Sequence, residues 1–255
     1  MSMTSFSLEG RVALITGARR GLGKAFALAM AEAGADVAVS DYVLETGELE
    51  AVAEEIRKIG RNSIAVQADV TRKSDVDNLV AKTIGKFGVI DILLNNAGVG
   101  SDPAILETSE EEWHRVININ LTSILLCSQA VSKGMMERKR GSIISIASCA
   151  GIRGFSTRNT YNVSKAGVVM LTKVLARDLG KYNVRVNAIA PSMVGTPMTE
   201  DFFNDPEKST AEARRIPLGR LGEVSDLVGP AIFLASDAAS YISAHTLVVD
   251  GGQLA

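Results

Sequence analysis

The sequence contains few of the residues that build disulfide frameworks, metal centres or histidine-dependent catalytic sites. Its 255 residues include two cysteines, Cys127 and Cys149, and two histidines, His114 and His245. Two isolated cysteines make neither a metal-ligand spacing nor a disulfide framework, so both are expected to be buried thiols. Two histidines without a cysteine cluster beside them argue against a Ser-His-Asp hydrolase and against a zinc site. No metal is therefore expected.

Strong charge of one sign and long hydrophobic runs are also missing. The formal net charge is −2 and the pI is about 5.8, which argues against a surface for nucleic acid or anionic membrane. The one dense basic run, Arg138-Lys139-Arg140, is interpreted as a solvated helix end. No apolar run reaches membrane-spanning length, and residues 1–10 show no signal-peptide pattern. We therefore expect a cytoplasmic protein with a small-molecule substrate and no nucleic-acid or membrane partner.

Short apolar segments alternate with longer amphipathic segments along the whole chain. Strand-like runs occupy Val12–Thr16, Val37–Ser40, Ser63–Gln67, Ile90–Leu94, Ser142–Ile146, Val184–Ala190 and Thr246–Val249. Helix-like segments lie between them at Leu22–Ala33, Thr46–Ile59, Lys73–Phe87, Glu110–Arg138, Asn159–Lys181 and Val224–Ser236. Strands that are apolar on both faces and separated by helices predict a parallel sheet covered on both sides.

This alternation predicts a single domain. The chain has a hydrophobic fraction of 46%, enough for a large core, and no Pro- or Ser-rich linker, repeat or low-complexity segment. We predict an α/β fold over residues 1–255, a Rossmann-like doubly wound parallel sheet of seven strands flanked by helices. The one long irregular insertion, residues 192–222, is predicted to be a substrate lid.

A glycine-rich turn joins the first predicted strand to the first predicted helix. It reads Gly17-Ala18-Arg19-Arg20-Gly21-Leu22-Gly23. The N-terminus of a helix offers free N–H groups and the positive end of its dipole to a pyrophosphate, and glycines let the backbone approach it. The spacing is Gly-x-x-x-Gly-x-Gly and not the Gly-x-Gly-x-x-Gly of the standard fingerprint, so an ordinary helix start is an alternative interpretation.

An acidic residue ends the second predicted strand. Asp41 lies about 20 residues beyond the glycine turn, where a carboxylate can accept hydrogen bonds from both ribose hydroxyls of a dinucleotide. The alternative is a structural Asp that caps a helix ahead of Glu45. Together, the glycine turn and Asp41 favour a dinucleotide site.

Tyr161 and Lys165 lie four positions apart in a predicted helix and therefore share one face. An ammonium group beside a phenol favours the phenolate and lowers the pKa of the phenol toward neutrality. Such a phenol can protonate a forming alkoxide as a general acid. The same spacing also occurs on solvated helices, so the pair alone leaves both interpretations open.

A set of motifs in a fixed order gives these residues a common interpretation. The chain resembles the short-chain dehydrogenase/reductase family from about Leu8 to the C-terminus. The motifs that carry the resemblance are Thr16–Gly23, Asp69-Val70, Asn95-Asn96-Ala97-Gly98, Asn120, Ser148, Tyr161-x-x-x-Lys165 and Pro191…Thr196. The resemblance implies an NAD(P)-dependent oxidoreductase that interconverts a secondary alcohol and a ketone.

The resemblance also implies a catalytic role for each of four residues. Tyr161 would donate and accept the proton, and Ser148 would hydrogen-bond the substrate oxygen. Lys165 would hold the nicotinamide ribose and lower the pKa of the tyrosine, and Asn120 would secure a water that links Lys165 to solvent. Each of these polar groups would then have the partner that burial requires.

An extended cofactor site follows from the same resemblance. Asp69 and Val70 would flank the adenine, and Thr196 would meet the carboxamide. The implied cofactor-binding residues are Gly17, Arg20, Gly21, Leu22, Gly23, Asp41, Asp69, Val70, Asn96, Ala97, Gly98, Tyr161, Lys165, Pro191, Val194 and Thr196. The family's usual Pro-Gly before the lid is Pro191-Ser192 here, and a serine has less backbone freedom than a glycine.

Two signals for the choice of cofactor oppose each other. Asp41 favours NAD, because a carboxylate about 4 Å from the 2′-phosphate of NADP would repel it by roughly 4 kcal/mol per charge pair at an effective dielectric of 20. Arg20 favours NADP, because family members that use NADPH often carry a base at that position. The repulsion of the 2′-phosphate by a carboxylate in a fixed position outweighs its attraction to an arginine whose side chain is mobile. We therefore expect NAD, with NADP as the alternative.

The sequence is least informative about the substrate. Arg153, Arg158 and Asn159 lie between the predicted catalytic serine and tyrosine, where a guanidinium could pair with a carboxylate or with vicinal hydroxyls. Arg153 and Asn159 are our candidate substrate-binding residues, and a solvated or subunit-contact loop is the alternative. The segment Phe6–Val12 resembles the start of family members that act on sugar acids, such as gluconate dehydrogenases. We therefore expect a polyol or sugar-acid dehydrogenase.

Two other functions stay open. A 3-oxoacyl-acyl-carrier-protein reductase that uses NADPH would have a similar overall pattern. Lys139 and Arg140 could contact an acidic carrier protein, but the second basic position of those enzymes corresponds to Tyr182. The alternative outside enzymes is a cofactor-binding scaffold or sensor, and the intact catalytic residues argue against it.

The surfaces of two predicted helices indicate that several copies of the chain form an oligomer. Glu110–Arg138 and Asn159–Lys181 carry apolar residues on more than one face, so part of that surface is predicted to contact other subunits. The family resemblance implies a homotetramer built on these helices and on Val248–Gly252.

Overall fold

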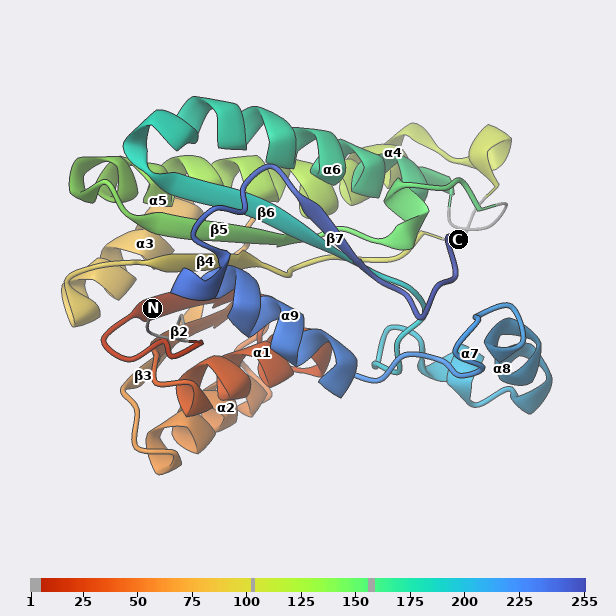
Figure 1. Cartoon of the computed structure of the whole chain (residues 1–255), viewed down its shortest axis with the longest axis horizontal. Helices are drawn as coiled ribbons and strands as arrows, with labels where there is room; N and C mark the ends of the chain where they lie inside the picture. Colours follow the sequence, from red (N-terminus) through yellow and green to blue (C-terminus); the bar gives the residue numbers. More distant parts are fainter. Residues whose placement is uncertain (1–5, 102–103, 156–158) are drawn as a thin grey trace.

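A parallel sheet forms the centre of the structure, a computed structural model that describes residues 6–101, 104–155 and 159–255 (Figure 1). Its strands are β1 (Val12–Thr16), β2 (Asp36–Asp41), β3 (Ser63–Gln67), β4 (Ile92–Asn95), β5 (Gly141–Ile146), β6 (Val184–Pro191) and β7 (Thr246–Val249). They lie in the order β3-β2-β1-β4-β5-β6-β7, and every neighbouring pair is parallel. All seven predicted strands are present, which confirms the predicted single-domain, doubly wound α/β fold.

Helices cover both faces of this sheet. One face carries α1 (Gly21–Glu32), α2 (Glu48–Lys58) and α9 (Ser225–Ala235), and the other carries α3 (Lys73–Phe87), α5 (Ser123–Arg138) and α6 (Asn159–Leu179) (Figure 1). Ala13 and Ile15 of β1 pack into one buried cluster with Phe26 of α1. Leu14, between them, packs into a second cluster with Met135 of α5, because successive strand residues point to opposite faces. This two-sided burial explains the continuous apolar runs of the strands.

The order of the strands reverses between β3 and β4. The chain adds β2 and β3 on one side of β1 and then returns, so that β4 pairs with the other side of β1. The connections that leave the carboxyl ends of β1 and β4 therefore run in opposite directions. Such a switch point is where open α/β sheets bind their ligands.

The helix predicted over Glu110–Arg138 is interrupted near its centre. α4 (Glu110–Ile117) runs into a π-helical turn, Asn118–Thr122, before α5 continues. A π turn inserts a residue into the helical repeat and re-aims the side chains beside it, and here the side chain of Asn120 is fully buried. The prediction of one continuous helix was wrong at this turn, because apolar periodicity carries no sign of it.

The segment predicted as irregular, residues 192–222, contains two short helices. They are α7 (Glu200–Phe203) and α8 (Pro206–Ala213), which stand off the carboxyl end of the sheet (Figure 1). Asp205 caps α8 by accepting hydrogen bonds from two backbone N–H groups, both at 3.1 Å, and Pro206 occupies its first turn. The prediction of an irregular segment was therefore wrong for α7 and α8. The Asp-Pro pair was the local signal of a helix start.

The remaining regular elements are short. They are the 3-10 turns Ile105–Glu107, Cys149–Gly151, Gly180–Tyr182 and Asp237–Ala239. Among the described helices, none combines the length and the apolar character needed to cross a bilayer.

Candidate active site

A cleft of about 1230 Å³ runs along the carboxyl ends of the strands. This volume exceeds the roughly 300–1,000 Å³ of a pocket for one small ligand, so a dinucleotide and a small substrate fit together. The predicted residues that line it are Gly17, Arg20, Gly21, Leu22, Asp41, Asp69, Val70, Asn96, Ala97, Gly98, Ser148, Tyr161, Lys165, Pro191, Val194 and Thr196. Two further predicted residues, Gly23 and Asn120, do not line the cleft and act on it through their neighbours.

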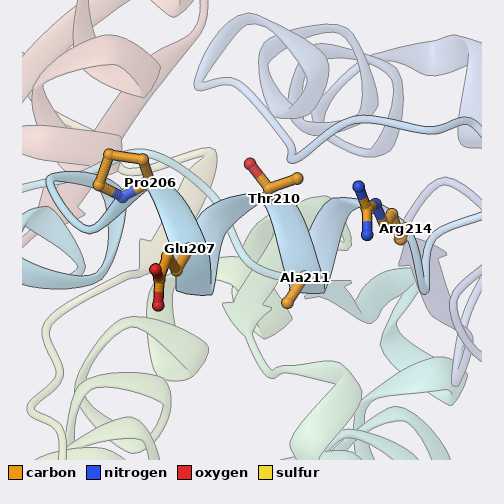
Figure 2. A pocket seen from close by; sticks show the side chains of 5 residues that line it. All are labelled: Pro206, Glu207, Thr210, Ala211 and Arg214. Atoms are coloured by element: carbon orange, nitrogen blue, oxygen red, sulfur yellow. The ribbon is translucent and has the colours of Figure 1, made fainter.

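A second, shallow hollow of about 380 Å³ lies on the outer face of α8 (Figure 2). It is lined by Pro206, Glu207, Thr210, Ala211 and Arg214. These residues share one helical face, as their spacing requires, and the hollow contains none of the predicted site residues. We therefore place the chemistry in the large cleft.

The glycine turn after β1 forms a cradle with no room for side chains. Gly17 has φ +63°, and a Cβ on it would lie 2.8 Å from Cα of Ala97. A Cβ on Gly23 would lie 2.6 Å from Nδ2 of Asn96, so both positions require glycine. The N-cap residue of α1, Arg20, makes no side-chain hydrogen bond to the first turn, so it leaves the N–H groups there available to a ligand. These features fit the pyrophosphate of a dinucleotide.

Asn96 holds this turn in place. Its Nδ2 donates to the carbonyl oxygens of Thr16 and Gly17, at 3.1 and 2.9 Å. In return, Oγ1 of Thr16 accepts hydrogen bonds from the backbone N–H groups of Asn96 and Ala97. The carboxyl ends of β1 and β4 are thereby joined. In this structure, Asn96 supports the cofactor site through the glycine turn.

Asp41 lies beside an arginine of the glycine turn. Nε of Arg19 is 3.6 Å from Oδ1 of Asp41, and the same guanidinium pairs with Glu48 at the start of α2. The Arg19 and Asp41 side chains are 13% and 12% exposed, so water screens their attraction only weakly. The hydrogen bond to Glu48 raises the pKa of Arg19 and lowers the pKa of Glu48. The Asp41 carboxylate is therefore partly neutralised by the Arg19 guanidinium.

The helix-capping alternative for Asp41 is wrong. Oδ1 of Asp41 accepts a hydrogen bond of 3.1 Å from the backbone N–H of Val43, within the turn that follows β2. α2 begins later, at Glu48, after Gly47 with φ +72°. The carboxylate thus remains at the wall of the cleft, where a ribose would lie.

Three of the four predicted catalytic residues line the cleft: Ser148, Tyr161 and Lys165. Tyr161 and Lys165 share one face of α6, as predicted, with Nζ of Lys165 5.5 Å from the centre of the tyrosine ring. Nζ donates to the carbonyl oxygen of Ile146 at 2.7 Å, and burial lowers the pKa of this lysine to about 8. Ser148 follows β5, and its Oγ accepts a hydrogen bond of 3.1 Å from the N–H of Ala150. One cation, one phenol and one positioned hydroxyl therefore share a single cleft.

Asn120 connects two walls of the cleft. Its Oδ1 accepts from the N–H of Val99 at 2.8 Å, and its Nδ2 donates to the carbonyl of Val99 at 2.9 Å and to Oγ of Ser164 at 3.1 Å. Ser164 in turn donates to the carbonyl oxygen of Tyr161 at 2.7 Å. The π turn is therefore fixed by tertiary hydrogen bonds, and it ties the loop after β4 to α6. A water relay through Asn120 stays a prediction, and its side-chain amide is already engaged by these three bonds.

The predicted substrate-binding residues do not line the cleft. Arg153 is exposed, and Asn159 starts α6 outside the lining. Arg158 lies outside the described residues. Other residues that line the cleft include the apolar Phe155, Met193, Met198 and Phe202 and a polar group that marks what we call the substrate end: Arg115, Asn162, Glu212, Arg215 and Gln253. Sequence reasoning missed them, because Glu212 belongs to the unpredicted α8 and Gln253 follows the last strand.

Comparison with known proteins identifies the family of this chain. A family model described as enoyl-(acyl carrier protein) reductase matches residues 17–253. A 3-oxoacyl-[acyl-carrier-protein] reductase from Synechocystis sp. is 43% identical over 249 residues, which cover 97% of this chain and 98% of the relative. The chain belongs to the short-chain dehydrogenase/reductase family.

Other members of the short-chain dehydrogenase/reductase family match as fully. A 2-dehydro-3-deoxy-D-gluconate 5-dehydrogenase from Escherichia coli is 39% identical over 256 residues, and the match covers 100% of this chain and 100% of the relative. A gluconate 5-dehydrogenase from Burkholderia cenocepacia, solved in complex with NADP and tartrate, superposes with a TM-score of 0.94. It is 33% identical, with 100% of this chain and 99% of that chain covered.

Family membership fixes the class of reaction. This short-chain dehydrogenase/reductase is an NAD(P)-dependent oxidoreductase that acts on CH–OH groups. It therefore requires a nicotinamide cofactor, and the glycine cradle at α1 fits the pyrophosphate of one. The interpretation as a scaffold without catalysis is disfavoured.

Proposed function

We propose that this short-chain dehydrogenase/reductase oxidises a small hydroxylated substrate, a sugar acid or a polyol. The observation that carries the proposal is the group of charged and amide side chains at the substrate end, three of which, Glu212, Arg215 and Gln253, contact one another. A hydroxylated acid supplies partners for such groups, whereas an acyl chain would desolvate them without a partner. The relatives that act on gluconate and 2-dehydro-3-deoxy-D-gluconate support the same class, as does the tartrate bound by the Burkholderia enzyme.

In this proposal, Tyr161 is the base in alcohol oxidation and the acid in ketone reduction. Its phenolate takes the proton of the substrate hydroxyl, and the Lys165 ammonium, 5.5 Å from the ring centre, stabilises that phenolate. Ser148 donates a hydrogen bond to the substrate oxygen, while the N–H of Ala150 fixes the serine hydroxyl. The nicotinamide, when bound, exchanges the hydride with the carbon that bears the oxygen.

The residues that would hold the cofactor follow the cleft from end to end. The glycine turn would take the pyrophosphate, and Lys165 the nicotinamide ribose. Asp69 and Val70 would flank the adenine, and Thr196 would meet the carboxamide. Residues 192–222, with α7 and α8, would then close over the substrate as a lid.

We propose NADP as the better cofactor, in place of the NAD that the sequence favoured. The repulsion expected from Asp41 is reduced by Arg19, 3.6 Å away, and both Arg19 and Arg20 line the cleft beside it. Three structural neighbours, from Burkholderia cenocepacia, Beutenbergia cavernae and Agrobacterium tumefaciens, were solved with NADP. Asp41 then remains free to accept from a ribose hydroxyl.

A 3-oxoacyl-acyl-carrier-protein reductase is the second candidate, favoured by the 43% identity to the Synechocystis enzyme. The decisive experiment measures kcat/KM of the purified protein with D-gluconate, 2-dehydro-3-deoxy-D-gluconate and acetoacetyl-CoA, each with both cofactors. We expect a hydroxylated acid to exceed acetoacetyl-CoA by at least about tenfold in kcat/KM. Faster turnover of acetoacetyl-CoA would establish the second candidate.

We also propose a homotetramer. α6 exposes Val163, Met170 and Val174, at 45%, 58% and 48%, along one side of the helix. An apolar stripe of this kind is typical of a subunit interface. Light scattering at micromolar concentration is expected to give a mass four times that of the chain, and a monomer mass would refute the proposal.

A further inference from the structure

Three polar side chains from distant parts of the chain meet at the substrate end. Nε2 of Gln253, in the C-terminal turn, donates to Oε1 of Glu212 on α8 at 2.5 Å. The other carboxylate oxygen of Glu212 accepts from Arg215, just beyond α8, at 3.3 Å. All three residues line the cleft that contains Ser148 and Tyr161. We call Glu212, Arg215 and Gln253 the polar clamp.

The members of the polar clamp differ in how firmly they are held. The Glu212 side chain is 17% exposed and contacts both of the others, whereas the Arg215 side chain is 77% exposed. A carboxylate that is mostly buried between two donors keeps its position. An exposed guanidinium can turn toward a ligand at little cost, because its pairing with Glu212 in water is weak. The clamp thus combines a fixed acceptor with a mobile cation.

The turn that carries Gln253 is ordered by its own hydrogen bonds. The Asp250 carboxylate accepts from the N–H groups of Gly252 and Leu254, both at 2.8 Å. Gly251 has φ +63°, and a Cβ on it would lie 2.7 Å from a methyl carbon of Ile216, at the exit of the lid segment. The C-terminal turn and the lid segment therefore pack directly on each other.

The same turn is anchored next to the catalytic serine. Cys149, the residue after Ser148, has its thiol 3.9 Å from Oδ2 of Asp250 and 3.7 Å from the carbonyl oxygen of Ala190. Asp250 therefore links the turn that carries Gln253 to the segment that carries Ser148. Ser148 and the three residues of the polar clamp line the same cleft.

We propose that the polar clamp is the subsite that recognises the end of the substrate remote from the reacting carbon. Arg215 pairs with a carboxylate of the substrate, and Glu212 and Gln253 hydrogen-bond its hydroxyl groups. The substrate class is accordingly an open-chain polyhydroxy monocarboxylate. This inference rests on the proposed function and deepens it, because it assigns the carboxylate to Arg215 and the hydroxyls to Gln253 and Glu212.

A matched pair of compounds tests the assignment. D-gluconate and D-glucitol have the same carbon chain, and only the acid carries a carboxylate. The variants are Arg215→Ala, Gln253→Leu and, as a control, Arg214→Ala, whose side chain lies on the outer face of α8 (Figure 2). For each protein, KM is measured with saturating cofactor, or Ki where a compound is not turned over.

Arg215→Ala should weaken the binding of D-gluconate at least about tenfold more than that of D-glucitol, because it removes the cation that pairs with the substrate carboxylate and leaves the Glu212 carboxylate to repel it. Arg215→Lys should recover part of this preference, since it restores the charge without the planar fork. Gln253→Leu should raise the KM or Ki of both compounds by similar factors. Arg214→Ala should change neither value by more than about twofold. The loss in each case should fall more on KM than on kcat.

Two outcomes separate the failure of this inference from the failure of the proposed function. If the wild type oxidises D-gluconate but Arg215→Ala and Gln253→Leu behave like Arg214→Ala, the polar clamp is not the subsite. The same conclusion follows if Arg215→Ala weakens D-gluconate and D-glucitol equally, since the residue would then only hold the lid. If the wild type oxidises no hydroxylated acid or polyol, the proposed function itself fails, and the clamp fails with it.

Discussion

The cofactor end and the substrate end of the cleft are held in place in different ways. At the cofactor end, Gly17 and Gly23 follow a buried strand and have no room for a side chain, and Asn96 locks their turn. At the substrate end, Glu212 of a short helix and Gln253 of the C-terminal turn hold each other. The proposed pyrophosphate site is thus built on the core, and the part that we propose to distinguish substrates is built from segments outside it.

The largest expected effect comes from a change at Tyr161, between the cofactor end and the substrate end of the cleft. Tyr161→Phe keeps the ring and removes the transferable proton, so kcat should fall by about 10²-fold or more. Cofactor affinity, measured by fluorescence titration, should stay within about twofold, since the change touches only the hydroxyl. Activity within a few-fold of the wild type would mean that another group is the acid.

The buried charge beside Tyr161 should make stability depend on pH. The pKa of Lys165 is lowered by burial from 10.5 to about 8, so between these values the unfolded chain binds a proton that the native protein does not. Stability should therefore rise with pH over this window, by at most about 3 kcal/mol. Chemical denaturation at pH 7 and pH 10 measures the rise.

Two lysine variants provide the comparison for that measurement. Lys165→Met should abolish the rise, and Lys173→Met, on the exposed side of the same helix, should retain it. An equal pH dependence in the wild type and in Lys165→Met would show that the charge at this site costs the native state nothing.

The fixed shape of the cofactor end predicts that it tolerates no added atoms. In Gly23→Ala, the new methyl would lie 2.6 Å from Nδ2 of Asn96, so the turn must shift. We expect cofactor affinity to fall by about tenfold or more, because overpacking typically costs about 1–3 kcal/mol. Gly85→Ala is the control, since a Cβ there meets nothing within 4 Å. Equal affinity in both variants would remove the distinction between the two ends.

The smallest expected effect concerns the choice between the two cofactors. Arg19→Ala should expose the charge of Asp41 and lower the NADP-to-NAD ratio of kcat/KM by on the order of fivefold. Asp41→Ala should weaken NAD and raise the same ratio. If Arg19→Ala and Asp41→Ala changed the NADP-to-NAD ratio of kcat/KM in the same direction, the opposite effects that we assign to the two charges would be contradicted.

The cofactor end could be predicted from the sequence because its signals are local. A strand that is buried on both faces, a glycine turn and a helix start follow each other within Val12–Glu32, and each has its own pattern. Arg19 was the exception there, because its partners Asp41 and Glu48 approach it only in the folded chain.

The substrate end could not be predicted because its contacts join residues far apart in the sequence. Arg153 was chosen for its place in the sequence between Ser148 and Tyr161, but its side chain is exposed and does not line the cleft. Asn120 was identified by a motif, while its π turn depends on hydrogen bonds to Val99 and Ser164. No pattern along the chain predicts such pairings.

The hydrogen bond between Glu212 and Gln253 has an evolutionary consequence. The two residues are 41 positions apart, yet a change at one alters a contact of the other. A substitution at either position alone removes this hydrogen bond, so the two positions should change together as lineages acquire new substrates. The glycine cradle, which is held by Asn96, can meanwhile stay constant. New specificity could then arise by paired replacements in two short surface segments, without a transition through a protein that has lost its cofactor.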